Sequence, residues 1–346
     1  KRQRRAQPPP GEHVRRGLLR YFYLVLDFSR ASSEADYRPN RLQAVSRHAQ
    51  AFIREFFDQN PLSQMAVIRV RAGVADSLTE LSSSPELHVE AIRRAVDCEG
   101  DFSLQNALEL AHSSLATLPP YGSREVLVIG SALSSCDPGN VFTAVAKCRK
   151  DKVRCSVISI AAELYLFKHV AEETGGNFFV AVGEEHFGEL LQRFCPPPPS
   201  LASATRASLV EMGFPAKREA PIGAFCAGVA GGEYVCPRCN ARAKELPSKC
   251  TICSLDLVSS PHLARSYHHL FPVPIFSEVP ADVPESRCCG CGAGVGREGA
   301  EAVWLRCPRC SGDFCFGCDS FIHESLHNCP CCELKAAVNP SSGVQR

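Results

Sequence analysis

The sequence contains no hydrophobic run of about 18 to 20 residues, the length that a membrane-spanning helix needs. The apolar stretch at residues 21–28 is short and ends beside an aspartate, which is not typical of a signal peptide. No domain is strongly basic, and the formal net charge is only +1. These absences predict a cytosolic or nuclear protein without membrane contact, and nucleic acid is not the expected partner.

Familiar catalytic signatures are also missing. The chain has no G-x-x-x-x-G-K-[ST] loop, no G-x-S-x-G elbow and no H-E-x-x-H motif. Paired carboxylates and bases of a hydrolase do not stand out either. The sequence therefore predicts a protein that holds partners and is not an enzyme.

Basic residues cluster at the start of the chain, at Lys1, Arg2, Arg4 and Arg5. Such a cluster is typical either of a nuclear address or of a solvated tail, and both interpretations stay open. The sequence does not begin with methionine, so residue 1 need not be the natural N-terminus. We expect residues 1–16 to form a basic, disordered tail.

Residues 17–195 alternate between short apolar runs and segments with helical periodicity, which favours a doubly wound α/β domain with a parallel sheet. A run of four prolines after Cys195 ends this pattern, and we expect a proline-rich linker or docking segment at residues 196–231. Strands are predicted at residues 21–28, 64–71, 124–131, 153–160 and 177–182, and helices at 42–57, 85–96, 103–118, 140–151, 164–174 and 184–194.

The abundant feature is cysteine: of 20 cysteines, twelve form six C-x-x-C pairs in the last third of the chain. In a reducing compartment, pairs at this spacing indicate zinc ligands more than disulfides. The first two pairs lie close enough to supply four thiolates to one tetrahedral zinc ion. They predict a four-cysteine zinc ribbon at residues 232–275, with the ligands Cys236, Cys239, Cys250 and Cys253.

The other four pairs predict an all-cysteine, RING-like module at residues 285–335 that holds two more zinc ions. The short gap between its second and third pairs is the cross-brace signature, in which pairs one and three bind one ion and pairs two and four the other. Too few apolar residues lie between the pairs for a self-sufficient core, so metal must supply much of the folding energy. The expected ligands are Cys288, Cys291, Cys315 and Cys318 for one ion and Cys307, Cys310, Cys329 and Cys332 for the other.

Alternative ligands exist within this module. Cys289 competes with Cys288, and Cys331 with Cys332, but only the chosen residues keep the C-x-x-C spacing. His323 and His327 are further candidates. Sites closed by four cysteines have no open position for water, so all three predicted zinc ions are structural. The six scattered cysteines that remain are expected to be free thiols.

The first domain resembles a von Willebrand factor A domain, whose D-x-S-x-S motif after the first strand holds Mg²⁺. This chain offers Asp27 and Ser29 but has Ala31 at the last position, and Ser103 is the match for the later hydroxyl ligand. The aspartate expected directly after the strand at residues 124–131 is absent. These departures predict a poor Mg²⁺ site unless a partner adds ligands.

The whole order of domains resembles the von Willebrand A and zinc-finger core subunits of TFIIH, the general transcription and DNA-repair factor. Matching stretches include residues 57–61, 78–82, 123–127, 173–176, 259–272 and 323–327. The resemblance implies a nuclear, non-catalytic subunit whose A domain binds and stimulates an XPD-type helicase. It also implies that the C-terminal zinc region contacts another von Willebrand A subunit, in transcription initiation by RNA polymerase II and in nucleotide excision repair.

Two other functions are compatible with zinc modules. RING-like modules often recruit ubiquitin-conjugating enzymes, so a ubiquitin ligase is the alternative. Direct DNA binding is not indicated, because the basic edge formed by Arg238, Arg242 and Lys244 is offset by Glu245 and Asp256, with no interleaved aromatic residues.

Overall fold

The computed structural model describes residues 19–119, 122–198, 209–218, 233–270, 273–280, 287–294 and 303–338. The chain divides into two compact units, Lys1–Ser266 and Tyr267–Arg346. Among the described residues, no helix is both long and apolar enough to cross a membrane. The predicted tail at residues 1–16 lies outside the described residues, as do residues 199–208 and 219–231 of the predicted linker.

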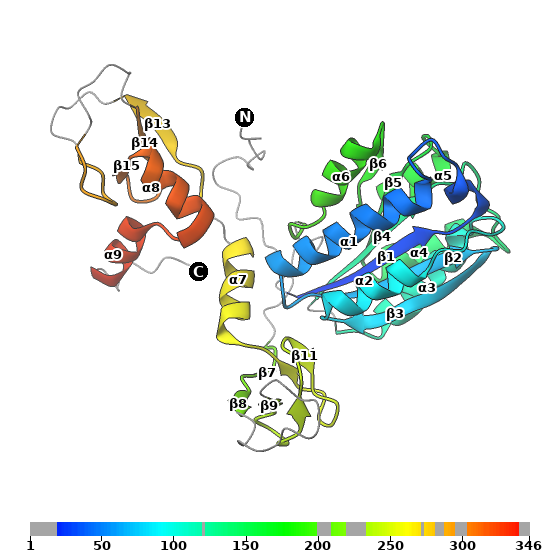
Figure 1. The fold of residues 1–346 in the computed structure, drawn as a ribbon, viewed down its shortest axis with the longest axis horizontal. Coiled ribbons are helices and arrows are strands. Elements are labelled where there is room, and N and C mark those ends of the chain that lie inside the picture. The colour runs from blue at the N-terminus through cyan, green and yellow to red at the C-terminus, as the bar shows by residue number, and fades with distance from the viewer. Residues whose placement is uncertain are drawn as a thin grey trace. The chain divides into compact units, whose positions relative to one another are not determined.

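A six-stranded sheet in the order β3-β2-β1-β4-β5-β6 forms the centre of the first unit (Figure 1). The strand β1 pairs in parallel with both β2 and β4, as expected for a doubly wound fold. The strands are β1 (Arg20–Asp27), β2 (Gln64–Arg71), β3 (Val74–Ser82), β4 (Ser123–Gly130), β5 (Val153–Ser159) and β6 (Phe178–Val180).

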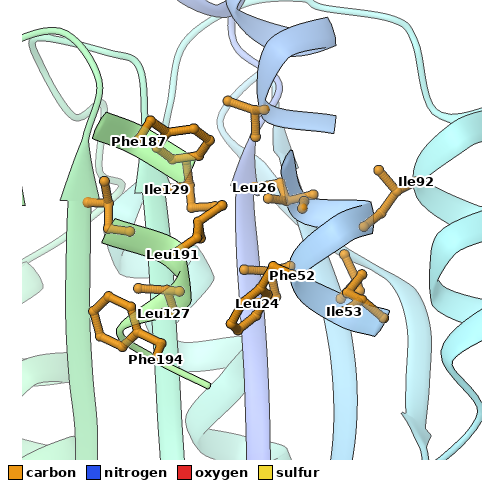
Figure 2. Close-up of a cluster of buried hydrophobic side chains, with 14 of the residues drawn as sticks. Leu24, Leu26, Phe52, Ile53, Ile92, Leu127, Ile129, Phe187, Leu191 and Phe194 are labelled. Carbon is orange, nitrogen blue, oxygen red and sulfur yellow. The ribbon is translucent and has the colours of Figure 1, made fainter. Parts of the chain in front are cut away.

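Helices cover both faces of the sheet. Successive residues of β1 point to opposite sides, so its apolar side chains pack under helices on each face. Leu24 and Leu26 pack under α1 (Arg41–Gln59), α2 (Pro85–Arg94) and α6 (Glu184–Gln192), as Figure 2 shows. Tyr23 and Val25 pack under the helices of the other face. Those helices are α3 (Leu104–Ala116), α4 (Val141–Lys150) and α5 (Tyr165–Thr174). The predicted doubly wound α/β domain is thereby confirmed.

The sequence prediction missed the strand β3 and placed only parallel strands in this sheet. It pairs antiparallel to β2 at the edge of the sheet, after a tight turn at Ala72 and Gly73, which both have positive φ. Its side chains are mostly half-buried or exposed, so it lacks the apolar run that marks the buried strands.

A buried ion pair closes the domain at its C-terminal end. The Arg20 guanidinium donates to both carboxylate oxygens of Glu125 at 2.9 and 2.7 Å. It also donates to the backbone carbonyls of Phe194 and Cys195 at 2.9 and 2.6 Å, and lies over the ring of Phe56. Because these groups come from β1, β4, α1 and the residues after α6, Arg20 fixes where the chain leaves the domain.

Short strands build the ribbon that follows. β9 (Glu233–Val235) pairs with β10 (Arg242–Ala243), and β11 (Ser248–Lys249) pairs with β12 (Asp256–Leu257). Each pair is extended by a strand from the segment predicted as linker, β8 (Ala216–Arg218) beside β9 and β7 (Met212–Gly213) beside β12. The ribbon therefore begins upstream of residue 232. The helix α7 (Ser260–Leu270) follows it.

The second unit contains the sheet β13-β14-β15, formed by Ser277–Pro280, Val303–Arg306 and Asp313–Phe314. A helical segment completes it: α8 (Phe316–Phe321), a π-helical turn η2 (Ile322–Leu326) and α9 (Pro330–Val338). Its small core contains Phe276, Trp304, Phe314 and Ile322 besides cysteines. Since β13 pairs with β14, this module begins upstream of the predicted residue 285.

Candidate metal centres

The twelve predicted zinc ligands lie in three groups of four cysteines. Within each group the sulfur atoms all lie within 4.8 Å of one another. Two groups belong to the second unit and combine pairs one with three and two with four, which is the cross-braced arrangement. The groups are Cys236, Cys239, Cys250 and Cys253; Cys288, Cys291, Cys315 and Cys318; and Cys307, Cys310, Cys329 and Cys332.

The distances between sulfur atoms fit a tetrahedral zinc ion. A Zn–S bond of about 2.3 Å places the four sulfurs of a tetrahedron about 3.8 Å apart. In the ribbon the Cys236–Cys253 and Cys239–Cys250 sulfur pairs are 3.6 and 3.4 Å apart. In the second unit, Cys291–Cys315, Cys307–Cys332 and Cys310–Cys329 are separated by 3.8, 3.8 and 3.6 Å. The folded chain therefore presents sulfur cages of the size that zinc requires.

Four of the six pairs sit in the same backbone turn. In the turn that begins at Cys236, the Asn240 amide donates to the Cys236 carbonyl at 3.0 Å, and the Cys236 amide donates to the Ala241 carbonyl at 2.8 Å. Asn240 has a φ of 59°, and Ser254, Gly292 and Ser311 at the equivalent positions also have positive φ. This turn aims both sulfurs of a pair at one point, so C-x-x-C spacing alone specifies half a site.

The remaining two pairs begin helices. Cys315 caps α8 and Cys329 precedes α9, with the amides of Asp319 and Glu333 donating to their carbonyls at 2.9 and 3.2 Å. Each group of the second unit thus joins one turn to one helix start, where the positive end of the helix favours thiolates. A metal ion held by each group would also fasten the helix to the sheet, since the small core offers few other contacts.

Backbone amides stabilise two thiolates within these groups. Although burial alone would raise it, the amides of Cys291, Cys315 and Gly290 lower the pKa of Cys288 to about 6. In the ribbon, the amides of Cys253 and Ile252 lower the pKa of Cys250 to about 6. Since metals bind the thiolate, these hydrogen bonds stabilise the metal-binding form of Cys288 and Cys250.

The alternative ligands lie elsewhere. His323 is placed between two backbone carbonyls, 2.9 Å from that of Asp319 and 3.1 Å from that of Pro274, and it packs edge-on against Phe276. His327 packs beside His268. Neither histidine belongs to a sulfur group, and neither do Cys289 and Cys331.

The Asp27 carboxylate, at the carboxyl end of β1, is hydrogen-bonded by backbone amides of the chain itself. Asp27 Oδ1 accepts the Ser29 amide at 2.8 Å, and Oδ2 accepts those of Ser131 and Ala132 at 2.8 and 2.9 Å. Burial raises the pKa of Asp27, and these hydrogen bonds oppose that effect. Ser103 begins α3 and donates to Asp137 at 2.9 Å.

Of the three predicted Mg²⁺ ligands, only Ser29 has a buried hydroxyl with no hydrogen-bond partner. One open hydroxyl does not fit a hard cation, which takes about six oxygen ligands. Sequence reasoning missed Arg41, whose guanidinium bridges the carbonyls of Ala31 and Ser131 at 3.2 and 3.1 Å. It also missed Asp137, because this aspartate lies well beyond the strand end where the motif expects it.

A von Willebrand A-type domain followed by a four-cysteine ribbon and a cross-braced cysteine module defines a modular protein with candidate structural metal sites. Residues 25–215 match the Ssl1-like family model, and residues 287–334 match the TFIIH C1-like domain. The chain belongs to the Ssl1-like family.

Several known proteins are similar to it over most of their length. General transcription factor IIH subunit 2 of Arabidopsis thaliana is 49% identical, covering 93% of this chain and 80% of that protein. General transcription and DNA repair factor IIH subunit ssl1 of Schizosaccharomyces pombe is 38% identical, covering 92% and 80%. Among solved structures, the TFIIH p34 N-terminal domain matches with a TM-score of 0.42 and 14% identity, over 50% of this chain and 95% of that one.

Proposed function

We propose that the chain is a core subunit of general transcription factor IIH that works in the nucleus, in transcription initiation and in nucleotide excision repair. Relatives that bear the name of this factor match nearly the whole chain. The subunit holds and regulates partners and does no chemistry itself. Sulfur sites closed by four cysteines support this, because they leave no position for a substrate or a reactive water.

We propose that each sulfur group holds one structural Zn²⁺, three in all. The sulfur separations of 3.4 to 3.8 Å support zinc, which accepts four sulfurs and has no redox chemistry. Elemental analysis of the purified full chain tests the number. About three zinc ions per chain are expected, and two or fewer in folded, unstripped protein would contradict the assignment of one group.

The best candidate for the surface that contacts the helicase is the carboxyl edge of the A-domain sheet. Four apolar side chains are exposed there, in the loops and helix starts that follow β4, β5 and β6: Leu133, Phe142, Tyr165 and Val182. Phe142 and Tyr165 both pack against His169, with ring centroids 5.2 and 5.8 Å apart. Partners of parallel sheets bind at this edge, and exposed apolar groups gathered there mark a docking surface.

Stimulation of the helicase would then be a shift between its conformations. If the carboxyl edge binds the active arrangement of an XPD-type helicase more tightly than the inactive one, binding raises the active population without any catalytic group. A tenfold shift needs a difference in binding of about 1.4 kcal/mol. Burying one or two of the exposed side chains is enough, since a large apolar side chain contributes about 1.5 to 3 kcal/mol.

Paired substitutions test this surface. Leu133→Glu combined with Tyr165→Glu should weaken helicase binding by about tenfold or more and abolish stimulation of unwinding. Leu87→Glu is the matched control, because Leu87 is also exposed but lies at the start of α2, which follows the antiparallel β3 at the opposite edge. Equal stimulation by both variants, with folding intact, would exclude the carboxyl edge.

The best candidate for the contact with the other von Willebrand A subunit is the helical side of this chain's second unit. Phe316, Phe321 and Leu334 are exposed on α8 and α9. Phe316→Ser with Phe321→Ser should release that subunit and leave zinc content unchanged, while Ile252→Ser in the ribbon serves as the exposed apolar control. If the same face instead supported autoubiquitination with a conjugating enzyme, the ligase alternative would replace this proposal.

A further inference from the structure

Arg41 is buried, although it is the first residue of α1. Its guanidinium binds the Asp36 carboxylate through two hydrogen bonds, from Nε to Oδ1 at 2.8 Å and from Nη2 to Oδ2 at 2.7 Å. A Glu34 carboxylate oxygen lies 2.9 Å from the same Nη2. Because a planar guanidinium bound by a carboxylate in this way keeps one orientation, the position of its third nitrogen is fixed.

That third nitrogen, Nη1, joins two loops. It donates to the Ala31 carbonyl at 3.2 Å and to the Ser131 carbonyl at 3.1 Å. Ala31 belongs to the loop after β1 and Ser131 to the loop after β4, so the two carbonyls come from segments far apart in the sequence. Arg41 is therefore a cationic bridge between two loops at the carboxyl edge of the sheet.

The metal motif departs from its complete form at these same two positions. Ala31 stands where the D-x-S-x-S motif has its last serine, and Ser131 opens the loop in which an aspartate is expected. The side-chain ligands through which Mg²⁺ would join the loops are thus missing where Arg41 connects them. The Asp27 carboxylate completes the junction, because its Oδ2 accepts the amides of Ser131 and Ala132 at 2.8 and 2.9 Å.

We propose that Arg41 is the positioning residue of the docking edge and joins its loops in place of a metal ion. It holds the loop after β4 in one arrangement, so the exposed Leu133, which follows Ser131 and Ala132, meets a partner in that arrangement. This inference rests on the proposed function, in which the carboxyl edge binds the helicase. A loop that is ordered beforehand loses less conformational entropy on binding than a loop that the partner must order.

Arg20 provides a matched comparison at the other end of β1. It also binds a carboxylate through two nitrogens, that of Glu125, and it also donates to two backbone carbonyls. Its carboxylate partner is buried, whereas that of Arg41 is partly exposed. Arg20→Met should therefore destabilise the domain at least as much as Arg41→Met does, without touching the carboxyl edge.

Hydrogen exchange of the full, metal-loaded chain tests the ordering of the loop without a partner. Arg41→Met should speed exchange of the amides at residues 131–134 by roughly tenfold, which corresponds to freeing about one ordered residue, while the central strands stay protected. Arg20→Met should leave exchange at residues 131–134 unchanged. Unchanged exchange in Arg41→Met, or an equal rise in both variants, would overturn the proposal.

Binding of a purified XPD-type helicase to the same variants tests the role in docking. Arg41→Met should weaken binding by roughly tenfold, since the partner must then order the loop, and Arg20→Met should bind like the wild type. Asp36→Ala keeps the guanidinium and removes only an exposed carboxylate, so it serves if Arg41→Met does not fold. It should weaken binding by about threefold.

The outcomes separate this inference from the proposed function. If Leu133→Glu with Tyr165→Glu abolishes binding but Arg41→Met and Asp36→Ala do not weaken it, the edge docks the helicase and Arg41 does not position it. If none of these variants changes binding, the docking surface itself is wrong. Recovery of Arg41→Met by excess Mg²⁺ would show that the edge can hold a cation, and this would refute the replacement of the metal by Arg41.

Discussion

Chelating the metal should unfold the second unit and leave the A domain intact. Among the described residues, the core cluster of the second unit contains four buried apolar side chains besides cysteines: Phe276, Trp304, Phe314 and Ile322. At about 1.5 to 3 kcal/mol each, they contribute about 6 to 12 kcal/mol to folding. A structural zinc site contributes about 10 to 16 kcal/mol, and this unit has two sulfur groups. Metal therefore stabilises the unit more than its apolar core does, and removing it exceeds the usual net stability of about 5 to 15 kcal/mol.

The sequence supplies its own reporter for this experiment. Trp304 is the only tryptophan of the chain and is 4% exposed, so tryptophan emission reports the second unit alone. After chelation, its emission should shift to that of a solvated indole, and added zinc should restore it. Far-UV circular dichroism, dominated by the A-domain helices, should change little. Unshifted emission after verified metal loss would refute our reasoning, and a parallel collapse of the dichroism would show that the two units do not fold independently.

Three further predictions concern single residues. Cys239→Ser should remove one zinc ion and unfold the ribbon, with A-domain dichroism unchanged; full zinc content would contradict the ligand assignment. Arg20→Met should lower the free energy of unfolding by about 2 to 4 kcal/mol in urea titrations, because the buried Glu125 carboxylate loses its guanidinium partner and keeps the Ser123 hydroxyl and nearby Arg154; a loss under about 0.5 kcal/mol, the range of ordinary surface substitutions, would refute the clamp. Burial lowers the pKa of His88 to about 4. Its contribution to the free energy of unfolding is therefore fully present above pH 6.5, and about 3 kcal/mol of it is lost as the pH falls toward 4. His88→Gln should flatten this part of the pH dependence, and equal slopes in both proteins would exclude His88 as its source.

The sequence predicts elements well where a local pattern carries them. The strand β1 is apolar from Tyr21 to Leu26 and α1 repeats apolar residues at helical spacing, so both are recognisable without tertiary information. The strand β3 carries neither signal, because an edge strand needs only one neighbour and keeps many polar side chains. β7 and β8 are equally invisible, since strands of two or three residues are defined only by the distant strands they pair with.

The cysteine groups follow the same division between local and distant information. A C-x-x-C turn places two sulfurs locally, so the spacing of Cys236 and Cys239 already predicts half a site. Tetrahedral coordination then requires a second pair, and few pairings are available. The hydrogen bond from Ser103 to Asp137 has no such rule behind it. It depends on packing between segments that no spacing rule connects.

The A-domain edge carries a degenerate metal motif. A complete D-x-S-x-S motif holds Mg²⁺, whereas this chain has Ala31 in place of the last hydroxyl. Here the Arg41 guanidinium lies between the loops after β1 and β4, where Asp36 and Glu34 pair with it, and backbone amides hold the Asp27 carboxylate. Of the exposed side chains around this edge, Leu133 and Tyr165 are apolar, whereas Arg30 and Glu163 are charged. Because the set of Mg²⁺ ligands is incomplete, we expect binding of the helicase at this edge to tolerate chelation of Mg²⁺.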